Sequence, residues 1–287
     1  MSKKLKTARL SIYSNSFLLI LKIFAGILSG SVSIISEAIH SAVDLIASFI
    51  AFLAVRISDT PPDDQHPYGH GKFENVSGVA EALLIFIAAG WIIYEAIHKI
   101  IAPTPIDSLG VGVVVMFISA IINIFVSRRL YKVAKETDSI ALEADGLHLK
   151  TDVYTSVGVG LGIIIIWLTD LYIIDPIIAI IVALLIIKES YNILIRAYSP
   201  LLDSKLDDKD IEIIKNIIDR NILENMNYHK FRTRKAGSLK YVDFHLEVPG
   251  NISVEESYKL CNKIENEIEI NLKRIEATIH VEPLKTL

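Results

Sequence analysis

Hydrophobic residues gather in long stretches that fill most of the chain between Leu10 and Ala197. A helix needs about 20 mostly apolar residues to cross roughly 30 Å of bilayer hydrocarbon, and each stretch comes close to that length or exceeds it. Short segments rich in Gly, Pro, Ser and Asp separate the stretches. We therefore expect a bundle of six transmembrane helices, at about Leu10–Leu28, Val32–Ile57, Val76–Ile101, Leu109–Tyr131, Ile140–Leu168 and Ile173–Ala197.

The second and fifth stretches are less apolar than the others, and we expect a strict hydropathy cutoff to miss them. Both carry His and Asp side chains at positions that face hydrocarbon in an ordinary membrane helix. This pairing of weak hydropathy with ionisable residues marks the two stretches as the chemically interesting ones.

The pattern changes after residue 202, where the chain reads as an ordinary soluble segment. A stripe of isoleucines from Ile211 to Ile218 predicts a helix, and strict alternation over Lys240–Val248 predicts a strand. Ser253 followed by Glu256 forms a capping box before a second helix, and Ala277–Val281 predicts a closing strand. We expect a six-span membrane domain at 1–202 and a small α+β domain of order αββαβ at 203–287.

Composition narrows the class of protein. Hydrophobic residues make up 52% of the 287 residues, charged residues 22%, and the net charge is −4. The charge argues against a basic nucleic-acid binder, and the hydropathy excludes a disordered chain. Cys261 is the single cysteine, so a disulfide framework and a Cys-rich zinc knuckle are excluded.

Basic residues predict the orientation of the expected spans. They lie before the first span, in the loop after the second and in the loop after the fourth, whereas the opposite loops have almost none. By the positive-inside rule both termini are cytoplasmic. The first apolar run lacks a small-residue cleavage site, so we expect an uncleaved protein of the inner or plasma membrane.

Two matching pairs of polar residues lie within the less apolar spans. His40 and Asp44 are four residues apart, as are His148 and Asp152, so each pair occupies one helix face. Two imidazoles and two carboxylates around a point suit a tetrahedral divalent ion, above all zinc. The alternative is a pair of structural His–Asp hydrogen bonds that tie helices together.

Four further acids lie near or within the spans: Glu37, Glu81, Glu143 and Asp145. Glu37 and Asp145 each precede a candidate histidine by about one turn. These acids either support the metal ligands or carry protons, or they are ordinary acids at helix ends and water-lined positions.

Two more clusters lie outside the spans. Asp63, His66 and His70 in the loop after the second span have a metal-ligand spacing, with Asp64 as a substitute ligand. In the tail, His280 and Glu282 share one face of the last predicted strand, and His229 and His245 add imidazoles. This set could bind metal at a subunit contact, or these could be surface histidines on a half-exposed sheet.

Three sequence motifs together resemble the cation diffusion facilitator family. They are residues 31–44 (SVSIISEAIHSAVD), residues 66–72 (HPYGHGK) and residues 143–152 (EADGLHLKTD). Their order and spacing agree with the family, as do six spans followed by an αββαβ tail. The resemblance covers essentially the whole chain.

The resemblance implies a function for each cluster. His40, Asp44, His148 and Asp152 match the family's transport site, and Asp63, His66 and His70 match a loop site near the membrane surface. His229, His245, His280 and Glu282 match a binuclear site at the cytoplasmic dimer interface. The family implies a homodimer with a metallochaperone-like (ferredoxin-like) tail that exports divalent cations in exchange for protons. The metal is then both substrate and regulator, with no other cofactor.

Departures from the family pattern affect the tail site and the choice of metal. Tyr258 stands where relatives have a bridging His, and Glu282 replaces Asp, so the tail site holds fewer ions or binds them differently. The transport site has His where some bacterial relatives have Asp, and two imidazoles with two carboxylates resemble the zinc-preferring variant. Iron, manganese, cobalt and cadmium transporters share much of the pattern.

Three other functions compete with export. A membrane metal sensor needs an output module, and we expect none after the tail. A membrane metallohydrolase is disfavoured because the sequence has neither HExxH nor Gly-x-Ser-x-Gly, so we expect no enzyme. A passive channel differs from an exporter only in lacking coupled flux.

Overall fold

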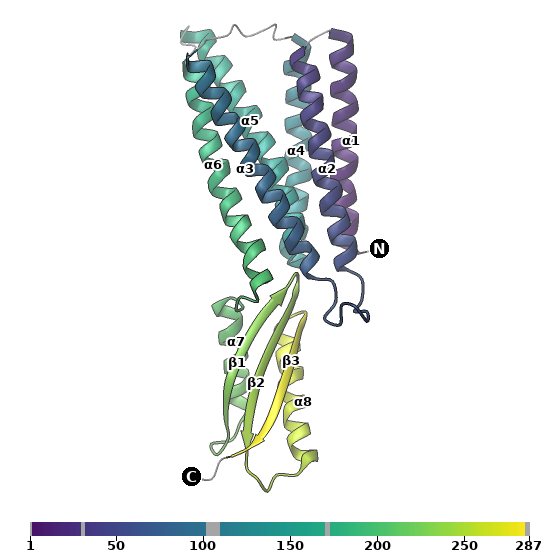
Figure 1. The fold of residues 1–287 in the computed structure, drawn as a ribbon, viewed down its shortest axis with the longest axis vertical. Coiled ribbons are helices and arrows are strands. Elements are labelled where there is room, and N and C mark those ends of the chain that lie inside the picture. The colour runs from purple at the N-terminus through teal and green to yellow at the C-terminus, as the bar shows by residue number, and fades with distance from the viewer. Residues whose placement is uncertain (1, 30–31, 102–109, 170–172, 285–287) are drawn as a thin grey trace. The chain divides into compact units, whose positions relative to one another are not determined.

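The computed structural model describes residues 2–29, 32–101, 110–169 and 173–284, and it divides into two compact units at residues 198 and 199. The first unit is a bundle of long helices (Figure 1). A helix is present at each expected stretch: α1 (Lys3–Ser29), α2 (Val32–Ser58), α3 (Lys72–Ile101), α4 (Gly110–Thr137), α5 (Ile140–Thr169) and α6 (Ile174–Tyr198).

Four stretches of these helices are long and apolar enough to cross a membrane: Lys3–Ala25, His40–Ser58, Lys72–His98 and Pro176–Leu202. The expectation that a hydropathy cutoff would miss the second span was therefore wrong. From His40 onward α2 is rich in Ala, Ile, Phe and Leu, and these residues outweigh its polar ones.

The helices pack mainly in pairs, α1 with α2, α4 with α5 and α3 with α6. Helix α5 contributes to two apolar clusters. Its Leu142 and Leu149 pack with residues of α1, α2 and α4, while its Ala144 and Leu147 pack with residues of α3 and α6. Polar side chains on α5 therefore lie between the two clusters, inside the bundle.

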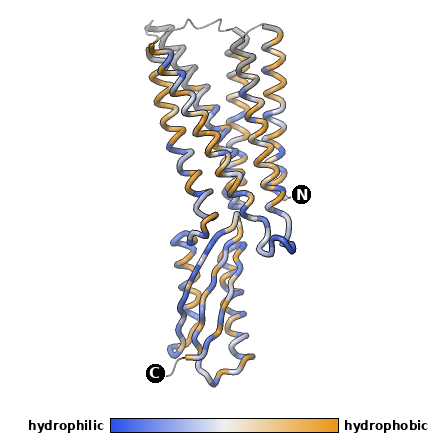
Figure 2. The backbone as a smooth tube through the Cα atoms, in the orientation of Figure 1, coloured by the Kyte–Doolittle hydropathy of each residue, from blue (hydrophilic) through white to orange (hydrophobic). Residues whose placement is uncertain are grey.

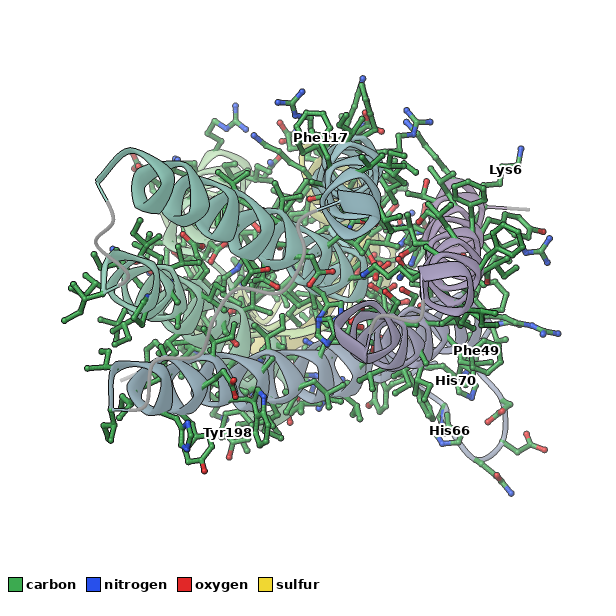
Figure 3. The ribbon with its side chains drawn as sticks, turned by 90° about the horizontal axis from the view of Figure 1, so that it is seen from above. Lys6, Phe49, His66, His70, Phe117 and Tyr198 are labelled. Atoms are coloured by element: carbon green, nitrogen blue, oxygen red, sulfur yellow. The ribbon has the colours of Figure 1, made fainter. Side chains whose placement is uncertain are left out.

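The outer surface of the bundle is apolar. Figure 2 shows hydrophobic residues along much of the helical bundle. Phe49 and Phe117 point away from the helices in Figure 3 and are 50% and 68% exposed, and Trp91 is 66% exposed. Apolar exposure on this scale is unusual for a water-soluble surface and suits contact with lipid.

The second unit begins with a short 3-10 helix (Ser199–Leu202) and continues as α7 (Asp208–Asn221), β1 (Asn227–Ala236), β2 (Leu239–Val248), α8 (Val254–Asn271) and β3 (Ile275–Pro283). This is the expected αββαβ order. The sheet order is β1-β2-β3, with β1 antiparallel and β3 parallel to β2. The parallel pair requires a crossover, which α8 provides.

The alternation in β2 gives the sheet one buried and one open face. Val242, Phe244 and Leu246 join a core with buried isoleucines of α7 and α8. The expected capping box is present, because the backbone N–H of Glu256 donates to Ser253 Oγ over 3.2 Å and the Ser253 N–H donates to Glu256 Oε2 over 3.0 Å. The alternating polar residues of β2 lie on the opposite face of the sheet.

Candidate metal-binding sites

The structure brings together the four polar residues of the second and fifth stretches. In α2, His40 and Asp44 lie one turn apart, and in α5 the same spacing separates His148 from Asp152. Nε2 of His148 lies 3.0 Å from Oδ1 of Asp44. Nε2 of His40 lies 3.8 Å from Oδ1 of Asp44 and 3.8 Å from Oδ1 of Asp152.

The separations within the tight group of His40, Asp44 and Asp152 are close to those of ligands around one metal ion, and His148 lies outside that group but contacts Asp44. Ligands about 2.1 Å from a tetrahedral centre are about 3.4 Å apart. Exposure differs across the cluster, since His148 and Asp44 are 6% and 5% exposed whereas the His40 side chain is 48% exposed. The cluster can therefore be reached from the side of His40.

A network of buried polar side chains lies next to Asp44 inside the bundle. One turn after Asp44, the Ser48 hydroxyl accepts a 2.6 Å hydrogen bond from the Asn15 amide. Ser48 and Ser11 both donate to Oδ1 of Asp145, over 3.2 and 3.1 Å. The network links α1 and α2 to α5, so these hydroxyls fix the packing of the helices that carry the cluster.

Asp145, which belongs to this network, and Glu81 each have one carboxylate oxygen without a hydrogen-bond partner among the described residues. Asp145 and Glu81 are 0% and 1% exposed, and neither Oδ2 of Asp145 nor Oε2 of Glu81 has a hydrogen-bond partner among the described residues. Burying an unpaired polar atom is costly, which points to a role beyond packing. Glu143 instead pairs with Arg196, and the side chain of Glu37 lies outside the described residues.

A third buried acid, Glu74 at the start of α3, was not singled out from the sequence. The Lys4 ammonium lies 2.6 Å from Oε1 of Glu74 and 2.8 Å from Oδ1 of Asp59. Ser58 and Ser139 also donate to Glu74. This ion-pair cluster joins the ends of α1, α2, α3 and α5.

The segment between Asp59 and Glu74 carries the expected loop site. Nδ1 of His66 lies 3.3 Å from Oδ1 of Asp63, and Nε2 of His70 lies 3.3 Å from Oδ2. The two imidazole rings lie beside each other, with centroids 4.5 Å apart (Figure 3). Nε2 of His70 therefore faces the Asp63 carboxylate, while Nδ1 is buried and has no hydrogen-bond partner among the described residues.

The Asp63 carboxylate is held in place by its own loop. The backbone N–H of His66 donates to Oδ1 over 2.6 Å, and this hydrogen bond lowers the pKa of Asp63. Gly69 makes the turn possible, because its φ of 78° is unfavourable for residues with a Cβ. The substitute ligand, Asp64, is exposed and lies outside the three-residue group.

The open face of the tail sheet carries a row of histidines. His229, His245 and His280 are direct neighbours across β1, β2 and β3. Oε1 of Glu282 lies 2.6 Å from Nδ1 of His245, and Oε2 lies 3.4 Å from Nε2 of His229. The hydrogen bond to His245 lowers the pKa of Glu282.

Two details of the tail differ from the expected ligand set. His280 lies at the edge of the cluster, with Nε2 3.6 Å from Oε1 of Glu282, and it is not in the tight group that the other three form. Glu247, which the sequence analysis did not propose, lies 3.7 Å from Nδ1 of His229. Glu247 lies two residues after His245 on the alternating strand, and this spacing could have identified it as a residue on the same face of the sheet.

Comparison with known proteins defines the class of this chain. Residues 8–202 match the cation efflux transmembrane domain, and residues 206–284 match the cytoplasmic domain of cation efflux proteins. The chain therefore belongs to the cation diffusion facilitator family, a family of cation efflux transporters.

Similar proteins match over nearly the whole length. An uncharacterized transporter of Synechocystis is 34% identical over 92% of this chain and 86% of its own length. The cation-efflux pump FieF of Shewanella oneidensis is 28% identical over 97% of this chain and 93% of its own. FieF of Citrobacter koseri is 31% identical over 93% and 89%.

Proposed function

We propose that this protein exports a divalent cation, zinc first, from the cytoplasm in exchange for protons. The observation that carries the proposal is the convergence of His40, Asp44, His148 and Asp152 inside the bundle. An ionisable group within a membrane span costs about 2.5–3.5 kcal/mol on insertion scales, so four together need a function. A transported cation that all four ligate supplies one.

The donor set supports zinc as the substrate. Two imidazole nitrogens and two carboxylate oxygens suit a four-coordinate ion of borderline softness, and the observed separations fit bond lengths of about 2.1 Å. Iron, manganese, cobalt and cadmium are the alternative substrates. Ligand type alone does not separate them, since cells also select metals by geometry and availability.

Proton exchange follows from the chemistry of the ligands. A histidine or carboxylate must lose its proton to hold a metal ion, so protonation of the same groups releases the ion. We propose that the ion is bound from the cytoplasm and that the bundle then opens the site outward. There, protons on His40 and His148 displace the ion.

The remaining assignments belong to the same proposal. Residues 1–202 form a six-span membrane domain with both termini in the cytoplasm, in the inner or plasma membrane. Residues 203–287 form a cytoplasmic domain through which two copies associate. Metal at Asp63, His66 and His70, or at His229, His245, His280 and Glu282, regulates the transporter and is not a cofactor of a reaction.

The test is metal uptake by reconstituted vesicles, with zinc, iron, manganese, cobalt and cadmium offered separately and internal pH followed. We expect zinc to accumulate in the vesicles as protons leave, and Asp152→Ala to abolish both fluxes. Metal flux without proton movement would support a channel. Metal binding without any flux under any gradient would support a membrane sensor and reject the proposal.

A further inference from the structure

A cavity of about 580 Å³ opens on the surface of the helical bundle, away from the metal-ligand cluster. Helix α4 supplies Tyr131 to its lining, α5 supplies Glu143 and Lys150, and α6 supplies residues from Glu189 to Arg196. Four charged side chains line the cavity beside apolar ones such as Ile193 and Ile195, although the surrounding bundle surface is mostly apolar. Its volume is within the range of small-ligand sites, roughly 300–1,000 Å³.

Two of the four charged groups in this cavity satisfy each other. The Arg196 guanidinium donates two hydrogen bonds to the Glu143 carboxylate, over 2.6 and 2.7 Å. A bidentate pair of this kind is geometrically specific and leaves neither charge available to a ligand. The pair therefore joins α5 to α6 and forms one side of the cavity.

The other two charged groups, Lys150 and Glu189, line the same cavity and form no ion pair among the described residues. The Lys150 ammonium lies 5.2 Å from the ring centroid of Tyr154 and 5.8 Å from that of Tyr131. Glu189 is exposed and has no hydrogen bond or ion pair within the part of the chain that the structure describes. Lys150 and Glu189 thus present one positive and one negative group to a common occupant.

An ammonium and a carboxylate on a lipid-facing surface need polar partners, because hydrocarbon offers none. Tyr131, Tyr154 and Tyr191 around the cavity are of the residue type that concentrates at the level of lipid headgroups. The Lys150 side chain can extend along the helix surface toward that level. A lipid headgroup is therefore a polar partner that the bilayer itself can offer to Lys150 and Glu189.

We infer that the cavity binds the headgroup of a zwitterionic phosphoglyceride with a primary ammonium group, as in phosphatidylethanolamine. The lipid phosphate pairs with Lys150, and the lipid ammonium donates hydrogen bonds to Glu189. An anionic headgroup would place like charge beside Glu189, and a choline headgroup has no N–H to donate. The inference rests on the proposed function in one respect, because it takes α4, α5 and α6 to lie in a bilayer.

The test is native mass spectrometry of the full-length protein, stripped of lipid in detergent and offered one lipid at a time. The probes are phosphatidylethanolamine, phosphatidylcholine and phosphatidylglycerol with identical acyl chains. We expect phosphatidylethanolamine to be retained about two- to fivefold better than phosphatidylcholine, the range for partly exposed charge pairs. Glu189→Gln should remove this preference, and Lys150→Gln should weaken retention of both lipids.

Matched controls are Lys188→Gln and Glu95→Gln, which change exposed residues of α6 and α3 outside the cavity. Both should bind lipid as the unaltered protein does. Equal retention of phosphatidylethanolamine and phosphatidylcholine by the unaltered protein would overturn the inference, as would variants that change nothing. Lipid retention is measured without metal, so loss of the headgroup preference and loss of metal transport are separate results.

Discussion

His148 and Asp44 lie 104 positions apart in the chain, yet Nε2 of the imidazole is 3.0 Å from Oδ1 of the carboxylate. Both side chains are buried, and they come from different helices of the bundle. The contact joins the two halves of the proposed transport site. Each half alone is an ordinary His–Asp pair on one helix, and only the packing of α2 against α5 brings the residues of the proposed site together.

Removing one carboxylate from this site should stop transport and leave the fold intact. Loss of an outer-shell group typically costs 10–100-fold in metal affinity, so loss of a direct ligand should cost at least about 100-fold. We expect Asp44→Ala and Asp152→Ala to reduce zinc uptake by that factor in vesicles. Size-exclusion profiles should be unchanged, and transport retained by either variant would contradict the assignment.

Replacing His40 with a carboxylate should change which metal is moved. The substitution His40→Asp converts the donor set to one nitrogen and three oxygens, which favours harder ions such as manganese and iron. We expect the ratio of manganese to zinc uptake to rise by about tenfold, the factor for 1.4 kcal/mol. His98→Asp, on an exposed position of α3, is the control and should leave the ratio unchanged.

The buried ion pair of Lys4 and Glu74 should matter far more for stability than a similar exposed pair. The two side chains are 3% and 1% exposed. Removing one partner of a buried pair typically costs about 3–5 kcal/mol, because it leaves an uncompensated charge. We expect Lys4→Met to lower the free energy of unfolding in detergent by about that amount.

The neighbouring residue supplies the matched control for this measurement. Lys3 pairs with Glu136, and their side chains are 51% and 39% exposed. Lys3→Met should change the free energy of unfolding by no more than about 1 kcal/mol. Equal effects of the two substitutions would show that the Lys4 pair is not buried.

The contact between His245 and Glu282 should make metal-free stability depend on pH. The pKa of Glu282 is lowered below its ordinary value of 4.5, chiefly by the hydrogen bond to His245. The stabilisation is therefore present above pH 4.5 and is lost as pH falls through the lower, folded-state pKa. Thermal unfolding of the metal-free protein should show Glu282→Gln less stable at neutral pH, with the difference shrinking in acid.

The helices and the metal-ligand candidates could be predicted from the sequence, because they depend on interactions between residues that are close together in the chain. A spacing of four residues puts two side chains on one helix face whatever the rest of the fold does, as for His40 and Asp44. Alternation in β2 likewise predicted which residues join His245 on the open face of the sheet. The capping box at Ser253 depends only on the first turn of α8.

Contacts that depend on the packing of distant elements could not be predicted from the sequence in the same way. Lys4 sits in a basic N-terminal segment that reads as exposed, and its burial needs α2 and α3 to close around it. Glu74 has no spacing that distinguishes it from a surface acid, and the alternation that places Glu247 near His245 does not identify its contact with His229. Their partners come from other elements, so only the assembled structure identifies them.

Lys4 also has a thermodynamic consequence for a site that it does not touch. It holds Asp59 and Glu74, the two ends of the segment that carries Asp63, His66 and His70. Bringing the ends of a loop together removes conformational entropy from the chain. The free-energy cost of that ordering arises only once, even when two interactions restrain the same loop. An ion held by the loop and the Lys4 ion pair both restrict the same segment, so each lowers the remaining entropic cost of the other. If the loop binds metal as proposed, then by reciprocity the ion would stabilise the junction of the helices by the same free energy with which Lys4 would raise the metal affinity.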